Sequence, residues 1–398
     1  MKDQYFSMYV MGGSQTRTDS LDGGSRIFIE CARRWLNDGI QIYFYTSEEG
    51  YSLLRRYRLT GIKYIIAPSS KYKRLGLYGL YAVRMIKQCI NVLKTKTEPE
   101  NFVIYSGSDF WPDAVPAFLM KMRFKNAKWV AGFYLFASSP FSSNTPYRGK
   151  AALKGLVYYF SQLPVYALER KYADSVWVTS EPDRYRFIGN RLSAGKVIAV
   201  RGGVDIKSPS LVAEPQNKMF DAVFIGRFHP QKGVLELIDI WKLVCAKKND
   251  AKLAMIGVGE LEDAIRSKMK ANGLERNIVL FGFKDGIEKI KIFKDSRIVV
   301  HPAIYDSGGM AACEAMACRL PGVSFDLPAL KTYYPKGMLK TPCFNLEVFA
   351  KNILDLLNNK DLYEKTSMDA LDWAKEWDWD KCAKDLLIEM LAMCHYQK

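Results

Sequence analysis

The chain has 398 residues, of which 48% are hydrophobic and 25% are charged, a composition typical of folded globular proteins. This length suits two domains better than one, and the formal net charge of +16 favours anionic partners such as phosphate groups, anionic lipids or nucleic acid. Eight cysteines without a CxxC pair and only three histidines argue against a disulfide framework, a zinc site or a histidine-based catalytic cluster.

The N-terminus carries no signal-peptide pattern, because Lys2 and Asp3 lead into a short apolar strand and not into a long apolar segment. The longest apolar runs, such as residues 129–137, are too short to span a bilayer. The cysteine pattern suits a reducing compartment. We therefore expect a cytoplasmic protein that is soluble or peripheral on the inner face of a membrane.

The first half of the chain alternates β-rich runs with helical patterns. Such alternation predicts a parallel sheet that is covered by helices on both faces. The predicted strands are Tyr5–Val10, Gln41–Thr46, Lys63–Ala67, Phe102–Tyr105, Lys128–Phe133, Ser175–Val178 and Lys196–Val200.

A polar stretch with two prolines, residues 204–218, interrupts this alternation and is predicted to be a linker. The alternation then resumes, so we predict an N-terminal domain over 1–203, a C-terminal domain over 219–372 and a closing helical segment over 373–398. Its tryptophans are expected to pack it onto a domain. The predicted strands of the second half are Asp221–Ile225, Ala251–Ile256, Asn277–Phe281, Arg297–His301 and Gly322–Phe325.

The segment 226–233, GRFHPQKG, follows a predicted strand and precedes a helix. Arg227 and Lys232 are suited to neutralise a diphosphate, the arginine through paired N–H groups and the lysine as a point charge. The alternative is a solvated turn with two surface cations. Two further loops carry glycines that permit close approach of a ligand, 256–260 (IGVGE) and 23–26 (GGSR), although a plain turn or helix start explains each equally well.

The most informative segment is 306–318, DSGGMAACEAMAC. Gly308 and Gly309 leave the following helix N-terminus uncovered, so its free N–H groups are available to an anion. Asp306 lies just ahead of that terminus, and Glu314 lies inside a helix of small apolar residues. A carboxylate there needs polar partners, which sugar or ribose hydroxyls supply. The alternative is that Glu314 binds nearby backbone as a structural group.

Taken together and in their order, six motifs resemble the retaining family 4 glycosyltransferases of the GT-B fold over nearly the whole chain. The resemblance implies an α/β architecture of two Rossmann-like domains facing a central cleft, with the last helix crossing back to the N-terminal domain. The motifs are GGSR (23–26), RGGVD (201–205), GRFHPQKG (226–233), IGVGE (256–260), DSGGMAACEAMACRLPGV (306–323) and WDWDKCAKDLL (377–387).

The resemblance also implies a role for each matching residue. Arg227 and Lys232 match cations on the donor diphosphate, Glu314 matches the acid that holds the nucleotide ribose, and Asp306 matches the acid that contacts the transferred sugar. Gly24 matches a glycine that faces the donor phosphates. The family is metal-independent, so no metal or other cofactor is expected. The remaining donor-binding candidates are Gly226, Gly257, Gly259, Ser307, Gly308, Gly309 and Met310.

Three features depart from the family pattern. Asp306 is one methylene shorter than the usual glutamate, in a DSGG form that looks like a known variant, and Arg319 replaces a common glycine. The N-terminal half contains no histidine, which puts any catalytic role of a histidine there in doubt. In a front-face retaining mechanism the leaving diphosphate takes the acceptor's proton, so charge stabilisation by Arg227 and Lys232 matters more than a protein base.

The acceptor side is less clear. Asp109 and Trp111 follow a predicted strand and are weak candidates for acceptor contacts, with helix capping as the alternative for the aspartate. The stretches 71–94 and 147–160 mix basic and aromatic or aliphatic residues, which suits an anionic membrane surface. An amphipathic helix packed on the sheet is the equal alternative.

The sequence therefore predicts a hexosyltransferase that uses a nucleotide-sugar donor and a glycan or lipid-linked acceptor, as in polysaccharide or glycolipid biosynthesis. Two other classes stay open: a sugar-nucleotide epimerase on the same fold, and a basic binding protein without catalytic activity. No nucleic-acid motif or aromatic stacking platform is present, so nucleic acid is not an expected partner.

Overall fold

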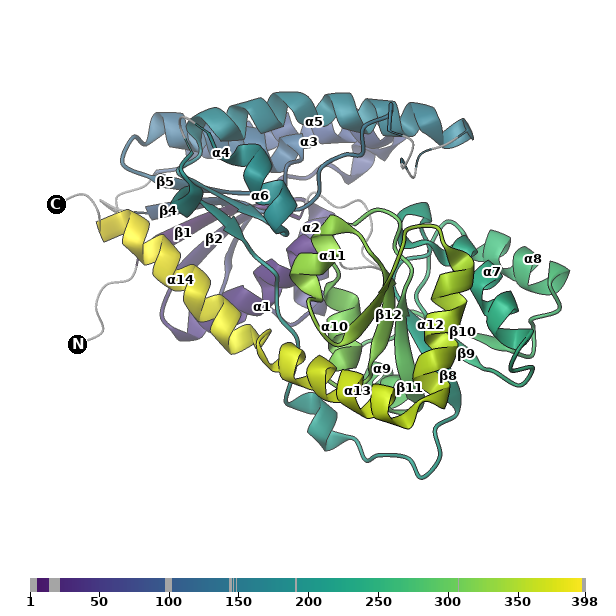
Figure 1. Cartoon of the computed structure of the whole chain (residues 1–398). Helices are drawn as coiled ribbons and strands as arrows, with labels where there is room; N and C mark the ends of the chain where they lie inside the picture. Colours follow the sequence, from purple (N-terminus) through teal and green to yellow (C-terminus); the bar gives the residue numbers. More distant parts are fainter. Residues whose placement is uncertain are drawn as a thin grey trace. The chain divides into compact units, whose positions relative to one another are not determined.

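The computed structural model describes residues 6–13, 22–96, 102–142, 145, 147, 149–189, 192–306 and 308–395. The chain forms two compact units (Figure 1). The first contains Met1–Ala137, Leu156–Gly202 and Trp379–Lys398, and the second contains Ser138–Gly155 and Gly203–Asp378. The stretch predicted as a linker, 204–218, thus lies at the start of the main segment of the second unit.

The first unit is built on a parallel seven-stranded sheet of order β3-β2-β1-β4-β5-β6-β7. Helices α3, α4 and α5 lie on one side of the sheet, and α1 and α14 lie on the other (Figure 1). All seven predicted strands are present. Their bounds are β1 Ser7–Met11, β2 Gln41–Thr46, β3 Lys63–Ile66, β4 Phe102–Ser106, β5 Lys128–Gly132, β6 Ser175–Val178 and β7 Val197–Ala199.

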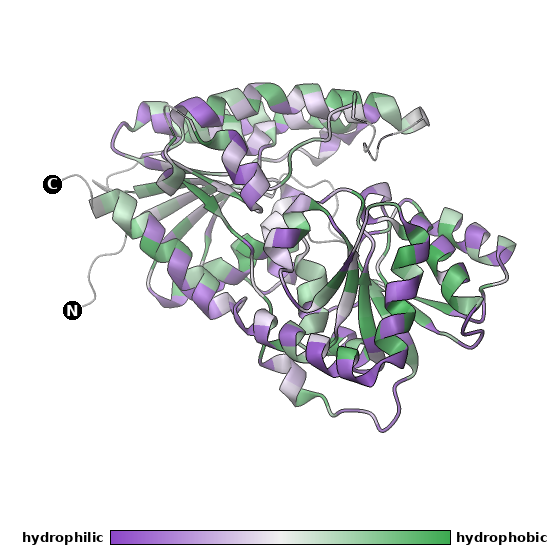
Figure 2. Ribbon diagram, in the orientation of Figure 1, coloured by the Kyte–Doolittle hydropathy of each residue, from purple (hydrophilic) through white to green (hydrophobic). Residues whose placement is uncertain are grey.

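The helices of the first unit carry both hydrophilic and hydrophobic residues along their length (Figure 2). In α3, for example, Leu80 and Val92 are buried, whereas Ile86 and Leu93 are exposed. The helix bounds are α1 Gly23–Asn37, α2 Glu48–Arg56, α3 Gly76–Lys94, α4 Trp111–Arg123, α5 Ala152–Tyr172, α6 Glu181–Phe187 and α14 Trp379–His395.

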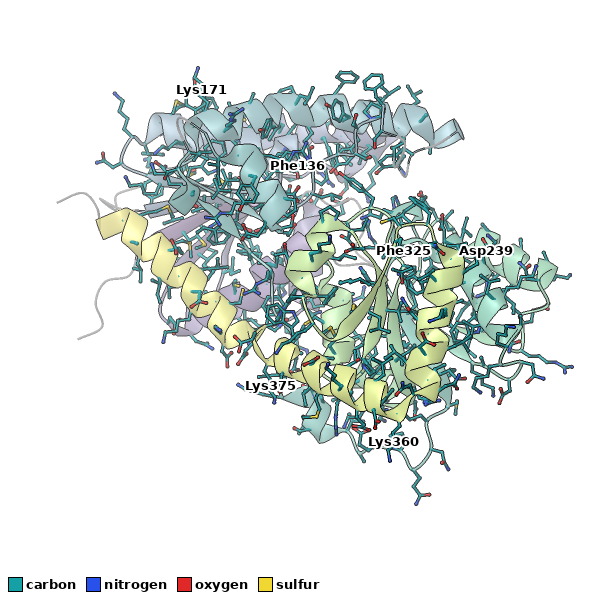
Figure 3. All side chains as sticks on the ribbon, in the orientation of Figure 1. Phe136, Lys171, Asp239, Phe325, Lys360 and Lys375 are labelled. Atoms are coloured by element: carbon teal, nitrogen blue, oxygen red, sulfur yellow. The ribbon has the colours of Figure 1, made fainter. Side chains whose placement is uncertain are left out.

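The second unit is built on a parallel six-stranded sheet of order β10-β9-β8-β11-β12-β13. Its four central strands are mostly buried, and Phe325 at the end of β12 lies in the apolar core (Figure 3). The strand bounds are β8 Phe220–Ile225, β9 Leu253–Ile256, β10 Ile278–Gly282, β11 Ser296–His301, β12 Gly322–Phe325 and β13 Met338–Thr341. The helices are α7 Val234–Cys245, α8 Glu262–Ala271, α9 Gly286–Lys294, α10 Met310–Met316, α11 Pro328–Tyr333, α12 Leu346–Asn358 and α13 Lys360–Lys375.

The sequence analysis missed strand β13. Its four residues, Met-Leu-Lys-Thr, are neither a continuous apolar run nor a clear alternation, and only the first and last are buried. This strand lies at the edge of the sheet and pairs only with β12 among the described strands. Edge strands tolerate polar residues, so their sequence signal is weak.

The closing helix returns to the first unit, as the resemblance implied. Helix α14 packs on α1, where Trp35 Nε1 donates to the Ala383 carbonyl at 2.8 Å and Arg34 Nε pairs with Asp380 at 2.6 Å. The tryptophans near this segment are structural: Trp377 is buried in the core of the second unit, and Trp373 Nε1 donates to the Tyr333 carbonyl at 2.6 Å. The fold class is confirmed as α/β with two Rossmann-like units.

Arg319 shows why glycine is common at its position. It follows α10 with φ of +63°, in the left-handed region where a side chain costs about 1–2 kcal/mol. Two contacts hold it there: its carbonyl accepts from Ser367 Oγ at 2.7 Å, and its guanidinium pairs with Glu364 at 3.0 Å. This departure from the family pattern therefore lies in the turn that follows the C-terminal end of α10.

Candidate functional site

The candidate site of the second unit lies at the carboxyl ends of β8, β9 and β11. Strand β8 sits between β9 and β11: the chain adds β9 and β10 on one side of β8 and then returns to add β11 on the other side. Such a switch point is where open α/β sheets bind their ligands. The loops that follow these three strands carry most of the residues that the sequence analysis singled out.

The loops after β8 and β9 pack backbone against backbone. Gly257 has φ of +150°, and a Cβ there would lie 1.9 Å from the Gly226 carbonyl oxygen. A Cβ on Gly259 would lie 2.4 Å from the Phe228 carbonyl oxygen, and Phe228 N donates to the Val258 carbonyl at 3.0 Å. These glycines are thus required by the packing of the two loops, whatever ligand the loops bind.

The loops after β8 and β11 are joined in the same way. Gly233 has φ of +62°, and a Cβ there would lie 1.9 Å from the Pro302 carbonyl oxygen. The backbone N–H of Ile304 donates to the Gln231 carbonyl at 3.0 Å. This contact fixes the short turn that carries Lys232 beside the loop that carries Asp306.

Lys232 and Asp306 form an ion pair, and their side chains are only 18% and 9% exposed. His301, the last residue of β11, places Nε2 3.6 Å from Asp306 Oδ2. Burial alone would raise the pKa of Asp306, but Lys232 and His301 outweigh it and lower that pKa to about 2. Burial lowers the pKa of His301, so its imidazole is neutral at pH 7. The Asp306 carboxylate is therefore ionised at neutral pH, and its cationic partner is Lys232.

The Gly308–Gly309 turn lies against two tyrosines of the α11 region. A Cβ on Gly308 would lie 2.6 Å from the Tyr333 hydroxyl, and one on Gly309 would lie 2.7 Å from the Tyr334 ring. Gly308 N donates to Asp306 Oδ1 at 3.3 Å, and no described side chain caps the start of α10 at Met310. Ser307, also a predicted donor-binding residue, lies outside the described residues.

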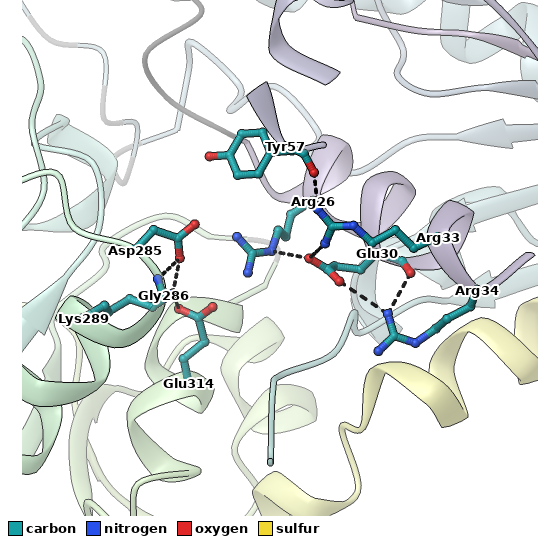
Figure 4. A network of polar contacts seen from close by, with 9 residues as sticks. All are labelled: Arg26, Glu30, Arg33, Arg34, Tyr57, Asp285, Gly286, Lys289 and Glu314. Carbon is teal, nitrogen blue, oxygen red and sulfur yellow. Dashed lines mark hydrogen bonds and ion pairs between the residues drawn. The ribbon is translucent and has the colours of Figure 1, made fainter. Parts of the chain in front are cut away.

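Glu314 is 21% exposed and pairs with a lysine, not with nearby backbone. Lys289 Nζ lies 2.9 Å from Glu314 Oε2 and 2.9 Å from Asp285 Oδ1 (Figure 4). The structure thus places each predicted acid of the 306–314 segment beside a lysine, Asp306 beside Lys232 and Glu314 beside Lys289.

Arg227 is exposed, and its side chain forms no hydrogen bond or ion pair with any described residue. Nearby, His229 is mostly buried, and its Nδ1 accepts from Gln231 N at 3.3 Å. Burial, together with the charge of Arg227, lowers the pKa of His229 to about 4. The imidazole is therefore neutral at pH 7, and the positive charge of this loop comes from Arg227 and Lys232.

The candidates in the first unit have their own structural partners. A Cβ on Gly24, in the first turn of α1, would lie 2.6 Å from the Tyr134 ring. Trp111 Nε1 donates to the Ser161 carbonyl at 2.9 Å. Asp109 accepts from Gln162 Nε2 at 2.8 Å, and burial raises its pKa to about 6. Asp109 does not cap α4, because the residue in the N-cap position is Phe110.

Sequence reasoning missed two residues of the site in the second unit. Lys289 lies in a lysine-rich helix that carries none of the motifs used in the sequence analysis. Its i, i+4 spacing from Asp285 is nevertheless a recognisable ion-pair pattern. His301 was included only as the end of a predicted strand. No local pattern indicates that it meets Asp306, because a turn of unknown shape separates the two.

Most of the second unit is similar in sequence to known proteins. Residues 212–373 match the family model of glycosyl transferases group 1. Over 162 residues, 40% of its length, this chain is 30% identical to an uncharacterized glycosyltransferase of Methanocaldococcus jannaschii. Over 142 residues, 34% of this chain, it is 30% identical to the poly(ribitol-phosphate) α-N-acetylglucosaminyltransferase of Staphylococcus aureus. These matches span 44% and 28% of the two relatives, so the chain spans less than half the length of either.

The structural comparison extends over the whole chain. The crystal structure of a mutant of S. aureus TarM in complex with Fondaparinux, α-GlcNAc-glycerol and UDP has a TM-score of 0.72 at 14% identity and covers 98% of this chain and 99% of its own. The structure of Anabaena HepE with UDP-glucose has a TM-score of 0.71 at 15% identity and covers 98% and 100%. The chain thus has the GT-B fold, and its residues 212–373 are similar to glycosyl transferases group 1.

The first prediction concerns the charge of Asp306. Replacing Lys232 with methionine removes the neighbouring cation but keeps the burial, so the pKa of Asp306 should rise from about 2 to above the ordinary value near 4. The stability contributed by ionised Asp306, present above pH 4 and lost as the pH falls toward 2, should disappear with it. A carboxyl carbon-13 NMR titration of aspartate-labelled protein measures the shift.

The matched control is Lys268→Met, which removes the partner of Asp239 in another ion pair of the same unit, 2.5 Å across. The titration of Asp306 should be unchanged in this variant. An Asp306 pKa that stays near 2 in Lys232→Met would contradict the ion pair.

Proposed function

We propose that this protein is a retaining, metal-independent glycosyltransferase that moves a hexose-type sugar from a nucleotide-sugar donor to a glycan or lipid-linked acceptor. The observation that carries the proposal is the largely buried Lys232–Asp306 pair, with the exposed Arg227 in the same loop as Lys232, at the switch point of a segment similar to glycosyl transferases group 1. Each part of the donor then has a chemically matched residue.

The diphosphate is assigned to Arg227 and Lys232. An exposed guanidinium without a partner among the described residues suits bidentate binding of phosphate oxygens. Lys232 Nζ has three donors and uses one on Asp306, which leaves capacity for a phosphate. Because His229 is neutral at pH 7, these two residues supply the positive charge that stabilises the leaving diphosphate.

The sugar is assigned to Asp306 and the ribose to Glu314. Asp306 stays ionised near neutral pH, so it accepts hydrogen bonds from sugar hydroxyls and favours positive charge developing at the anomeric carbon. In the proposed front-face reaction, the bond from the anomeric carbon to the diphosphate oxygen breaks. The acceptor oxygen bonds to the same face, and its proton passes to the leaving diphosphate.

The names of relatives and structural neighbours support the substrate classes. HepE is described with UDP-glucose, and TarM with UDP and α-GlcNAc-glycerol. Two relatives act on poly(ribitol-phosphate) and poly(glycerol-phosphate). An anionic acceptor of this kind would suit the net charge of +16. On the acceptor side we retain Asp109 and Trp111 as candidates, and Gly24 for the donor phosphates.

A direct test compares transfer by Arg227→Ala and Glu314→Ala with transfer by the unaltered protein. Arg227→Ala should lower kcat about 100-fold or more, because it removes charge stabilisation of the leaving group. Glu314→Ala should mainly raise KM for the donor, about tenfold, because ribose binding is equal in the ground and transition states. Release of nucleoside diphosphate, with and without acceptor, measures both.

Lys268→Ala serves as the matched control, since it removes a surface cation of the same unit away from these loops. Unchanged donor hydrolysis and transfer in both site variants would show that the site is wrongly assigned. Formation of an epimeric nucleotide-sugar without diphosphate release would instead identify an epimerase.

We also propose that the first unit binds an anionic membrane surface through α3 and α5. Ile86, Ile90 and Leu93 form an exposed stripe on α3 at i, i+4 and i+7, and Phe160 is 54% exposed on α5. Lys94 is exposed next to Leu93 at the end of α3, and Lys171 is exposed near the end of α5 (Figure 3). Exposed apolar side chains beside cations are the pattern of an interfacial surface. Among the described helices, none is both long and apolar enough to cross a bilayer.

Vesicle co-sedimentation tests this surface. Replacing Ile86, Ile90 and Leu93 together with serine should weaken binding to phosphatidylglycerol-containing vesicles at least tenfold. Each apolar side chain that enters the membrane contributes about 1.5 kcal/mol of transfer free energy, and the serine variant loses this contribution. Met368→Ser, at an exposed position of the second unit, should change nothing. Equal binding by the triple variant and the unaltered protein would contradict the proposal.

A further inference from the structure

Lys289 joins two acids that come from different segments of the second unit (Figure 4). Its Nζ lies 2.9 Å from Asp285 Oδ1 and 2.9 Å from Glu314 Oε2, while its side chain is only 9% exposed. An ammonium this deeply buried loses most of its hydration, which costs several kcal/mol unless charged partners replace the water. The two carboxylates are thus what permits a lysine at this position.

The fold explains why Lys289 reaches Glu314. Helix α9 connects β10, at the sheet edge, to β11 near the centre, so it crosses the same face of the sheet that α10 covers. Ile290 and Phe293 of α9 share an apolar core with Cys313 and Met316 of α10. Lys289 precedes Ile290 in this packed helix, so its backbone is held firmly relative to Glu314.

The other end of the bridge is equally fixed. Asp285 is the N-cap of α9, and its Oδ1 accepts from Gly286 N at 2.9 Å as well as from Lys289 Nζ. The N-terminus of α9 therefore anchors Asp285, Asp285 orients Lys289, and Lys289 holds Glu314 (Figure 4).

This arrangement leaves Glu314 ready to accept further hydrogen bonds. Lys289 engages Oε2, and no hydrogen bond from a described residue reaches Oε1. A carboxylate has about four lone-pair sites, so most of its capacity is available to a pair of neighbouring hydroxyls. A glutamate held in one rotamer binds such a pair without the entropy loss of ordering three torsions.

We propose that Lys289 is a positioning residue for the nucleotide: it fixes the Glu314 carboxylate so that the site selects a ribose diol, with Asp285 holding Lys289 in turn. This inference rests on the proposed function, in which Glu314 holds the donor ribose. On this proposal, the preference for ribonucleotides over their deoxy forms depends on the relay formed by Asp285, Lys289 and Glu314, and not on Glu314 alone. If Lys289 only joined α9 to α10, its replacement would change the affinity for ribose and deoxy nucleotides by the same factor.

Calorimetric titration with a nucleoside diphosphate and its 2′,3′-dideoxy form separates these roles. The probe is the tightest binder among UDP, GDP and ADP. Lys289→Met should weaken binding of the diphosphate about tenfold, the range for losing hydrogen bonds to a charged group, and change binding of the dideoxy form less than twofold. Lys289→Arg keeps the charge and should restore most of the affinity.

The same titrations in a Glu314→Gln background complete a double-mutant cycle. Adding Lys289→Met there should weaken binding no further, because the lysine acts through the carboxylate. Equal weakening of both probes by Lys289→Met, or an undiminished effect in the Glu314→Gln background, would overturn the relay. If Glu314→Gln leaves the preference for the ribose form unchanged, or if none of the three diphosphates binds, the proposed function itself fails.

Discussion

The ion pair between Lys232 and Asp306 is the constraint on which the candidate site depends, because it joins two loops that leave different strands. Both groups are largely removed from water, and losing one partner of such a pair typically costs about 3–5 kcal/mol. The pair also sets the charges: it keeps Asp306 ionised and leaves Lys232 donors for a second anion. A ligand diphosphate would then meet a lysine that this pair already holds in place.

Glycines allow the loops to come close enough for that pair to form. A side chain on Gly233 would collide with the Pro302 carbonyl, and one on Gly257 would collide with the Gly226 carbonyl. The loops after β8, β9 and β11 are therefore held by backbone contacts before any ligand arrives. A preorganised polar site of this kind stabilises charge that develops in a transition state without reorganising.

Motif spacing and strand–helix alternation were sufficient to predict the fold class, both parallel sheets and the return of the last helix. They failed where the signal is not local. Strand β13 reads as a polar loop because edge strands need little apolar pattern, and Lys289 lies in a helix whose lysines look alike until packing buries one. The sequence left open whether Gly257 and Gly259 face a ligand or only make a turn; the contacts show that the neighbouring loop requires glycine at both positions, and their role toward a ligand stays a prediction.

The most direct test of the central claim, a nucleotide-sugar site in the glycosyltransferase domain, is thermal unfolding of the unaltered protein with a panel of nucleotide-sugars. A ligand that binds only the folded state raises the unfolding midpoint to an extent set by its concentration and affinity. We predict that at least one nucleoside-diphosphate sugar raises the midpoint in a saturable manner and that the matching free sugar does not. A midpoint unmoved by every nucleotide-sugar, but raised by an unrelated polyanion, would contradict the account and favour a basic binding protein.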